Sequence, residues 1–414
     1  MKILLWHGYL LSGTGSNIYT QAIARAWSRD GHDVTVFCQE PEPERFDLGG
    51  AEVVRPELPD GLLPVFVVDR YEGLEARRLQ DLTVTEREAY IGANVEALTK
   101  RLPADLVFAN HVLPGGAVAA ATGAPFAVKA HGSELEYSIR ESPELAVVAE
   151  EALAGAGAVF VGSGHIADVL EQVVGRVARV VQVPPGVDVD EFRPESREEA
   201  LRNLLDECRR DPPNPANANE RLPDEGNATR LDQFLAGDRP TVLYFGKLLY
   251  NKGVHLLLEA LHGLEARTLI VGFGDYRHRL EDLAPPRTLF TGPLEHRHLV
   301  HLIPLADVVV VPSIFPEAFG MVAAEAAAAG CAPIVARHSG LAEIAEGLES
   351  AYPERHRPLT SFTQGDSVEL QEKLHDLLAL SADERAELGA AARRVAVDRW
   401  SWEGVARRLL EPFQ

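Results

Sequence analysis

A chain of 414 residues is longer than one hydrophobic core normally supports, so we expect two domains of ordinary size. The 62 acidic residues outnumber the 40 basic ones and leave a net charge of −22. This charge argues against nucleic acid as a partner, because phosphate backbones are bound by dense Lys and Arg. No apolar run is long enough to span a bilayer, and the three cysteines stand far apart without metal-binding spacing. We therefore expect no stable membrane insertion and a reducing, cytoplasmic compartment.

In the first half of the chain, short apolar runs alternate with longer stretches of helical period. This alternation is typical of βα units around a parallel sheet. The predicted strands are residues 2–7, 34–38, 106–109, 126–130, 158–162 and 180–183, and the predicted helices are 17–30, 86–101, 115–122, 143–154 and 165–174. We predict a doubly wound, Rossmann-like domain over residues 1–184.

A polar stretch follows this domain. Residues 211–227 are rich in Pro and Asn and carry too few apolar groups to offset the entropy of ordering. We therefore expect a flexible, exposed insertion at about 205–230. Asp188 and Asp190 precede it in a Pro-Gly-rich connection without further oxygen ligands nearby, so we assign no metal there.

The second half repeats the βα pattern. The predicted strands are residues 241–246, 268–271, 288–291, 308–311 and 333–336, and the predicted helices are 254–261, 276–283, 297–305, 320–329, 368–380 and 382–399. These elements predict a second Rossmann-like domain over residues 185–399. A short amphipathic helix follows, and we expect it to dock on the protein, because Glu403 and Glu411 interrupt its basic face.

Two polar segments follow predicted strands of the first half. The first strand leads into the glycine-rich turn that contains Gly13 and Gly15, but Ile18 stands where a dinucleotide fingerprint needs its third glycine. A plain turn and a phosphate contact remain equally plausible interpretations. His131 and Glu134 follow the strand at 126–130, at the edge where ligands of such sheets bind. Because glycine comes directly after it, His131 can project while its backbone stays close to a ligand.

The second half offers two lysines in a chain that has only six. Lys247 ends the strand at 241–246, and Lys252 opens the next helix. Such cations beside a helix N-terminus would neutralise a diphosphate that leaves during a reaction. A solvated turn is the alternative interpretation, which composition alone does not reject.

Two glutamates bracket a run of small residues after the strand at 308–311. Glu317 falls in a loop, Gly320 permits a close turn, and an Ala-rich helix then begins with free amide groups that attract phosphate. Glu325 lies farther along this helix, where a carboxylate can bind the vicinal hydroxyls of a ribose. With both lysines, these residues predict a site for a nucleoside diphosphate linked to a hydroxyl-bearing group.

Together these motifs resemble the retaining nucleotide-sugar glycosyltransferases of family 4, which have the GT-B fold. The resemblance covers nearly the whole chain outside the insertion. It implies an α/β fold of two doubly wound Rossmann-like domains facing a central cleft, with the segment 400–414 packing back on the first domain. The glutamate motif is the most specific feature and the glycine loop the least.

The resemblance also implies roles for individual residues. Glu325 would bind the ribose, and Glu317 the hydroxyls of the donor sugar. His131 would lie beside the anomeric carbon, and Gly15 would bring its backbone to the phosphate. The remaining donor-binding residues would be the amides around Phe319, Gly320, Met321 and Val322, with Lys247 and Lys252 on the diphosphate. Lys247 departs from the arginine that is common at its position and lacks the bidentate fork.

The implied reaction transfers a sugar from a nucleoside-diphosphate sugar, with UDP favoured, to the hydroxyl of a small-molecule or glycan acceptor. It keeps the α configuration by a metal-independent, front-face mechanism, and no cofactor is expected besides the donor as co-substrate. The catalytic residues would be His131, Glu317 and Lys252. A sugar-nucleotide epimerase of the same fold and a non-catalytic nucleotide-sugar-binding protein remain alternatives.

Overall fold

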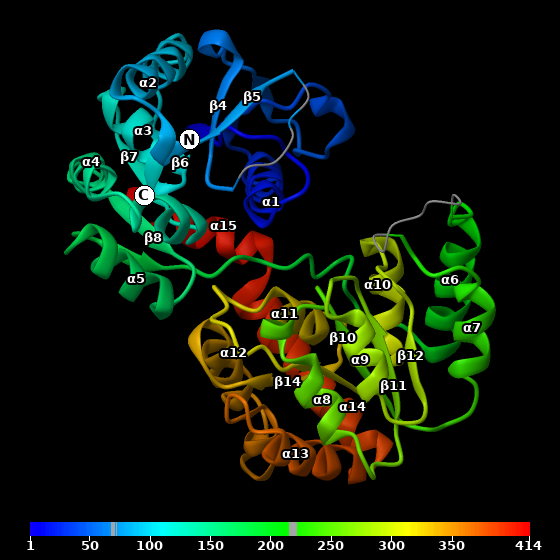
Figure 1. Cartoon of the computed structure of the whole chain (residues 1–414). Coiled ribbons are helices and arrows are strands. Elements are labelled where there is room, and N and C mark those ends of the chain that lie inside the picture. The colour runs from blue at the N-terminus through cyan, green and yellow to red at the C-terminus, as the bar shows by residue number, and fades with distance from the viewer. Residues whose placement is uncertain (68–70, 72, 215–221) are drawn as a thin grey trace. The chain divides into compact units, whose positions relative to one another are not determined.

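The computed structural model describes residues 1–67, 71, 73–214 and 222–414. The chain forms two compact units, which are described separately (Figure 1). Unit 1 comprises Met1–Gly186 and Trp402–Gln414, and unit 2 comprises Val187–Ser401. No helix of the described ranges combines the length and apolar composition needed to cross a membrane.

Unit 1 is built on a parallel sheet of seven described strands, in the order β3-β2-β1-β6-β7-β8-β9. Both faces of the sheet are buried. Ile3 and Leu5 of β1 belong to one apolar cluster, and Leu4 and Trp6 belong to another. Burial on both faces explains the continuous apolar runs of the sequence. The strand bounds are β1 Lys2–Trp6, β2 Asp33–Phe37, β3 Glu52–Val54, β6 Leu106–Asn110, β7 Phe126–Lys129, β8 Ala158–Val161 and β9 Val180–Gln182, and a separate pair comprises β4 Leu62–Val65 and β5 Glu75–Arg78.

The helices of unit 1 include one from the C-terminal end of the chain. This helix, α15, lies beside α1 (red and blue in Figure 1). The indole N–H of Trp27 donates to the Ala406 carbonyl at 2.9 Å, and Val405 and Leu409 are buried in the same apolar cluster. The bounds are α1 Gly15–Arg29, α2 Val84–Thr99, α3 Ala117–Ala121, α4 Pro143–Leu153, α5 Gly164–Val174 and α15 Trp402–Leu410.

Unit 2 has a parallel sheet of six described strands, in the order β12-β11-β10-β13-β14-β15, around a single large apolar cluster. Its strands are β10 Thr241–Phe245, β11 Arg267–Val271, β12 Thr288–Phe290, β13 Val308–Val311, β14 Ala332–Ala336 and β15 Ser361–Phe362. Its helices are α6 Arg197–Arg210, α7 Asn227–Phe234, α8 Val254–Ala260, α9 Arg277–Leu283, α10 His296–Leu302, α11 Met321–Ala328, α12 Ser339–Glu349, α13 Ser367–Ala379 and α14 Ala382–Val395.

Every strand predicted from the sequence is present within one residue of its expected bounds. The prediction missed β3, β4, β5 and β15, which are short. It also missed α6, α7 and α12, although the buried residues Leu341, Ile344, Ala345 and Leu348 of α12 have helical spacing.

The structure differs from the expectation of a flexible insertion at about 205–230. Residues 205–210 belong to α6, whose Leu205 and Cys208 are buried in the core of unit 2. On the far side, Asp224 accepts hydrogen bonds from both terminal nitrogens of Arg277, at 2.9 and 2.7 Å. Ion pairing therefore stabilises polar side chains in this stretch. The part of the expected insertion at 215–221 lies outside the described residues.

The two tryptophans near the C-terminus belong to different units. Trp400 packs in unit 2 against Gly347 and lies edge-to-face with Phe319, at 5.9 Å between ring centroids. Trp402 packs in unit 1 against Gly186 and lies 5.6 Å from Tyr19. The chain thus returns to unit 1 between Ser401 and Trp402, slightly later than the sequence interpretation placed the change.

Candidate active site

In unit 2, the loops that follow β10, β11 and β12 are joined through their backbones. The Leu248 amide donates to Phe273 at 2.7 Å, and the Gly272 amide donates to Gly292 at 2.9 Å. A Cβ atom on Gly272 would lie 1.8 Å from the carbonyl oxygen of Gly246, so only glycine fits there. The loops therefore present a closely packed backbone at the carboxyl edge of the sheet, where ligands of α/β sheets bind.

The loop between β13 and α11 is fixed on the first turn of α12. The amide of Glu317 donates to Ser339 Oγ at 2.9 Å, and the amide of Gly340 donates to the Glu317 carbonyl at 3.0 Å. A Cβ atom on Gly340 would lie 2.5 Å from the Cα of Phe319. Phe319 itself is buried against Trp400. These contacts hold Glu317 at a defined position without using its carboxylate.

The helix α11 begins with free amide groups. Its N-cap, Gly320, has a φ of 118° and no side chain to cap the helix. The amides of Ala323 and Ala324 donate to the Gly320 carbonyl. In the described part of the chain, the amides of Met321 and Val322 have no acceptor. Two unpaired N–H groups at a helix N-terminus form an anion-binding position.

Glu325 carries an unpaired carboxylate on the same helix. Among the described residues, no group donates a hydrogen bond to it. Burial raises the pKa of Glu325 to about 7, although the nearby His296 acts in the opposite direction. A partly buried carboxylate without a partner has lost some of its hydration, and hydrogen bonds from a ligand would compensate that loss. Vicinal hydroxyls of a ligand would supply them.

The two lysines of unit 2 differ in their surroundings. Lys252 Nζ donates to the carboxylate of Glu317 at 2.6 Å, and the two side chains are 31% and 23% exposed. Glycine at position 253 lets this loop lie against the end of β13, because a Cβ there would be 1.9 Å from the Pro312 carbonyl oxygen. An ammonium has three N–H donors, so Lys252 retains two for a ligand. Lys247 is exposed, and its Nζ has no partner within the described residues.

In unit 1, His131 belongs to a chain of hydrogen bonds that reaches the glycine-rich turn. His131 Nε2 lies 2.8 Å from Asn110 Oδ1, and Asn110 Nδ2 donates to Thr20 Oγ1 at 2.9 Å. The Thr20 hydroxyl donates to the Ser16 carbonyl at 2.8 Å. Burial, together with His111 and Lys129, holds the pKa of His131 well below its ordinary value. The imidazole is therefore neutral at neutral pH.

Glu134 joins the ends of β6 and β7. Its buried carboxylate accepts from the His131 amide at 2.9 Å, from the Val112 amide at 3.3 Å and from His111 Nδ1 at 3.2 Å. Burial would raise the pKa of Glu134, but His111 and the amide donors hold it below its ordinary value. His111 has a φ of 67°, a strained conformation for a residue other than glycine. Glu134 thus holds an unusual backbone in place beside His131.

The glycine-rich turn is anchored by Asn17. His7 Nε2 lies 2.9 Å from Asn17 Oδ1, and the Asn17 amide donates to Thr14 Oγ1 at 3.4 Å, which caps α1. Gly15, the first residue of α1, is exposed, and a Cβ there would have open space. The turn therefore caps a helix and leaves Gly15 accessible.

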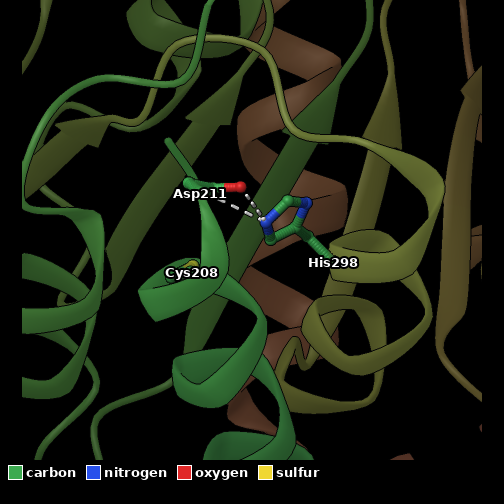
Figure 2. A group of neighbouring side chains, drawn as sticks. All are labelled: Cys208, Asp211 and His298. Carbon is green, nitrogen blue, oxygen red and sulfur yellow. Dashed lines mark hydrogen bonds and ion pairs between the residues drawn. The ribbon is translucent and has the colours of Figure 1, made fainter. Parts of the chain in front are cut away.

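Cys208, Asp211 and His298 form a group of possible metal ligands in unit 2 (Figure 2). The amide of Glu295 donates to His298 Nδ1 at 3.2 Å, which places the ring proton on Nε2. This N–H points at the Asp211 carboxylate, at 3.1 and 3.2 Å. Nε2 therefore has no lone pair for a metal. Asp211 also accepts from Arg297, and burial raises the pKa of the Cys208 thiol to about 12. The group anchors the end of α6 and does not fit a metal.

The structure brings most of the expected site residues into two groups. Glu317, Gly320 and Glu325 lie on one segment of unit 2 with Lys252 bound to it, and Gly15 and His131 lie in unit 1. The sequence interpretation missed Asn110 and His111. Both stand at the end of a predicted strand, which was the signal that singled out His131.

Comparison with known proteins matches each half of the chain to a glycosyl transferase model. Residues 14–186 match the model of the glycosyl transferase 4-like domain, and residues 228–395 match the model of the glycosyl transferases group 1. A D-inositol 3-phosphate glycosyltransferase of Xylanimonas cellulosilytica is 28% identical, over 96% of this chain and 91% of its own length. A GDP-mannose-dependent phosphatidylinositol monomannoside mannosyltransferase of Mycobacterium tuberculosis is 27% identical, over 68% of this chain and 67% of its own.

Solved structures share the fold over the whole chain. HepE of Anabaena, solved in complex with UDP-glucose, superposes with a TM-score of 0.66 at 18% identity and covers 99% of both chains. Sucrose-phosphate synthase of Thermosynechococcus elongatus superposes with a TM-score of 0.62 at 22% identity, covering 99% of this chain and 97% of its own. The fold is GT-B, with two Rossmann-like domains. With family models matching both halves, the chain belongs to the family 4 glycosyltransferases, which use nucleotide-sugar donors.

Proposed function

We propose that this enzyme transfers a sugar from a UDP-sugar to an acceptor hydroxyl with retention of the α configuration and without a metal. The observation that carries the proposal is the end of α11, where two unpaired amides and the unpaired carboxylate of Glu325 occur on one eight-residue helix. An anion-binding position next to a diol-binding carboxylate fits a ribose diphosphate.

The proposed roles follow from the contacts of each side chain. Glu325 accepts the ribose hydroxyls, and the amides of Met321 and Val322 bind phosphate oxygens. Lys247, whose ammonium has no partner among the described residues, neutralises the diphosphate. Lys252 does the same with its remaining N–H groups, while Glu317 orients it and contacts the sugar.

The proposed chemistry needs no covalent intermediate. The bond between the acceptor oxygen and the anomeric carbon forms as the bond from that carbon to the phosphate oxygen breaks, and the departing phosphate takes the proton of the acceptor. Glu317 is a poor candidate for a nucleophile because its carboxylate is already paired with Lys252. Stabilisation of the leaving diphosphate by the lysines and amides then supplies most of the catalysis. His131, whose imidazole is neutral, is the further catalytic residue of the proposal.

The identity of the donor is tested by a thermal-shift screen against UDP-, GDP-, ADP- and dTDP-sugars. A ligand at a hundred times its Kd stabilises the folded state by about 2.7 kcal/mol. We favour UDP, as in the HepE complex, whereas the Mycobacterium tuberculosis relative is named for GDP-mannose. A shift with UDP-sugars that disappears in Glu325→Ala supports the proposal, and a shift with another nucleotide alone contradicts the choice of UDP. The absence of any shift in the wild type contradicts it.

The stereochemical course is tested separately. Proton NMR of the glycoside formed from an α-linked donor should show an α anomeric signal, and a β signal refutes retention.

The three cysteines are free and buried, which supports a cytoplasmic location. A fluorescent fusion recovered in the membrane or secreted fraction would contradict that location.

A further inference from the structure

The chain of hydrogen bonds behind His131 fixes more than the position of the ring. It runs from His131 through Asn110 and Thr20 to the carbonyl of Ser16. Asn110 and Thr20 are completely buried, so water does not compete for these bonds. The direction of each bond follows from the end of the chain, because a backbone carbonyl only accepts.

The protons are assigned step by step along this chain. The hydroxyl proton of Thr20 is used on Ser16, so Thr20 Oγ1 must accept from its other neighbour, Asn110. The amide group of Asn110 therefore turns its NH₂ to Thr20 and its oxygen to His131. An amide oxygen only accepts, so His131 Nε2 carries the ring proton. Nδ1 of His131 is left with a lone pair.

Nδ1 is also the free nitrogen of this ring. Within the described ranges, His131 Nδ1 makes no hydrogen bond. It is not a fully buried atom, so solvent reaches it. The neighbouring histidine, His111, uses its ring nitrogens differently. His111 donates through Nδ1 to Glu134 and keeps a buried Nε2 without a partner. His131 is thus the histidine of this group that offers an accessible acceptor.

We propose that Asn110 and Thr20 are positioning residues that lock His131 in the Nε2–H tautomer, so that Nδ1 serves as a hydrogen-bond acceptor for a substrate hydroxyl. This inference rests on the proposed glycosyl transfer for its role in catalysis, but the tautomer itself is a property of the unliganded protein. With the amide of Asn110 reversed, its NH₂ would face Nε2 and force the proton to Nδ1, where it would repel a hydroxyl donor.

The first experiment reads the tautomer directly. Long-range ¹H–¹⁵N correlation spectra of protein labelled with ¹⁵N-histidine distinguish protonated from unprotonated ring nitrogens, and loss of signals in His131→Gln assigns the ring. We expect Nε2 protonated and Nδ1 unprotonated. A protonated Nδ1 overturns the proposal. The measurement needs no substrate, so its result does not depend on the proposed function. The proposed function fails by a different result, namely that the wild type transfers no sugar.

The second experiment perturbs the lock at a distance. Thr20→Val keeps the shape but removes the hydroxyl that orients Asn110, and Thr20→Ser restores it. The matched control is Thr99→Val, because Thr99 makes the same bond to a carbonyl four residues earlier, Val95, at 2.7 Å in α2. We expect Thr20→Val to populate the Nδ1–H tautomer and to lower kcat about tenfold, with the KM for the donor nearly unchanged.

The outcomes separate positioning from a merely structural role. Recovery of both the tautomer and kcat in Thr20→Ser, with no effect in Thr99→Val, supports the proposal. A fall in kcat without a change of tautomer shows a structural role and overturns it. A change of tautomer that leaves kcat intact overturns it as well. Urea unfolding of each variant shows whether a loss of activity reflects unfolding instead, in which case the wild-type spectrum alone decides.

Discussion

Replacing the carboxylic acid of Glu325 by the amide of glutamine should stabilise the unliganded protein while weakening nucleotide binding. The pKa of Glu325 is raised from 4.5 to about 7, mainly by burial. The folded state therefore keeps its proton between these two values while the unfolded state releases it. The stability of the wild type should fall as the pH rises from 4.5 to 7 and should level off above pH 7.

The magnitude follows from the shift. At about 1.4 kcal/mol per pKa unit, the full effect above pH 7 would be roughly 3 kcal/mol. Because water still reaches part of this side chain, we expect roughly half of that, about 1–2 kcal/mol. Glu325→Gln lacks the ionisation and should show no such loss. Its advantage over the wild type should therefore be small at pH 4 and largest at pH 8.

The assay is urea unfolding of the wild type and Glu325→Gln at pH 4 and pH 8, followed by circular dichroism. Glu354→Gln is the matched control, because it removes an exposed carboxylate from the same unit. Only Glu325→Gln should gain stability selectively at pH 8, and it should bind UDP more weakly. An equal stability difference at both pH values, or undiminished UDP binding, would refute the reasoning.

Three further predictions follow, the first of them with a control substitution in α2. Gly340→Ala should destabilise unit 2 by about 1–3 kcal/mol and weaken donor binding, because its Cβ would lie 2.5 Å from the backbone of Phe319. The control Gly92→Ala has open space for its Cβ in the interior of α2 and should stabilise the protein by about 0.5–1 kcal/mol. Urea unfolding checks that the two substitutions change the stability in opposite directions. Lys247→Met should raise the Kd for UDP about tenfold by calorimetry, with the loss shrinking in high salt; no change would remove Lys247 from the diphosphate site. Activity should persist in excess EDTA, measured as release of nucleoside diphosphate, whereas recovery only on added Mg²⁺ would contradict a metal-independent mechanism.

Most strands of both sheets were accessible from the sequence because buried parallel strands need continuous apolar runs. The run at 308–311 predicts β13, and the small residues after it predict α11 at nearly its observed start. The same principle failed at β3 and β5, whose residues are half-buried or exposed and include charged side chains. Local composition misled at 205–210 and 222–230, because helix packing and the Asp224–Arg277 pair depend on residues distant in the sequence.

The candidate site was accessible only where a residue type is unusual for its place. Glu325 stands out as an acid in an Ala-rich helix, and Lys252 as one of six lysines. The pairing of Lys252 with Glu317 was not accessible, because 65 residues separate them. Asn110 and Thr20 gave no signal either, since a buried amide and hydroxyl acquire their roles from the protons that their neighbours donate or accept.

The most direct test of the donor site is calorimetric titration of UDP and GDP into the wild type, Glu325→Ala and His131→Ala. We predict that the wild type binds one of the two nucleotides. Glu325→Ala should bind it at least tenfold more weakly, which corresponds to about 1.4 kcal/mol. His131→Ala should bind it as the wild type does while losing turnover. Equal affinity in Glu325→Ala, or no binding of either nucleotide to the wild type, would contradict the account.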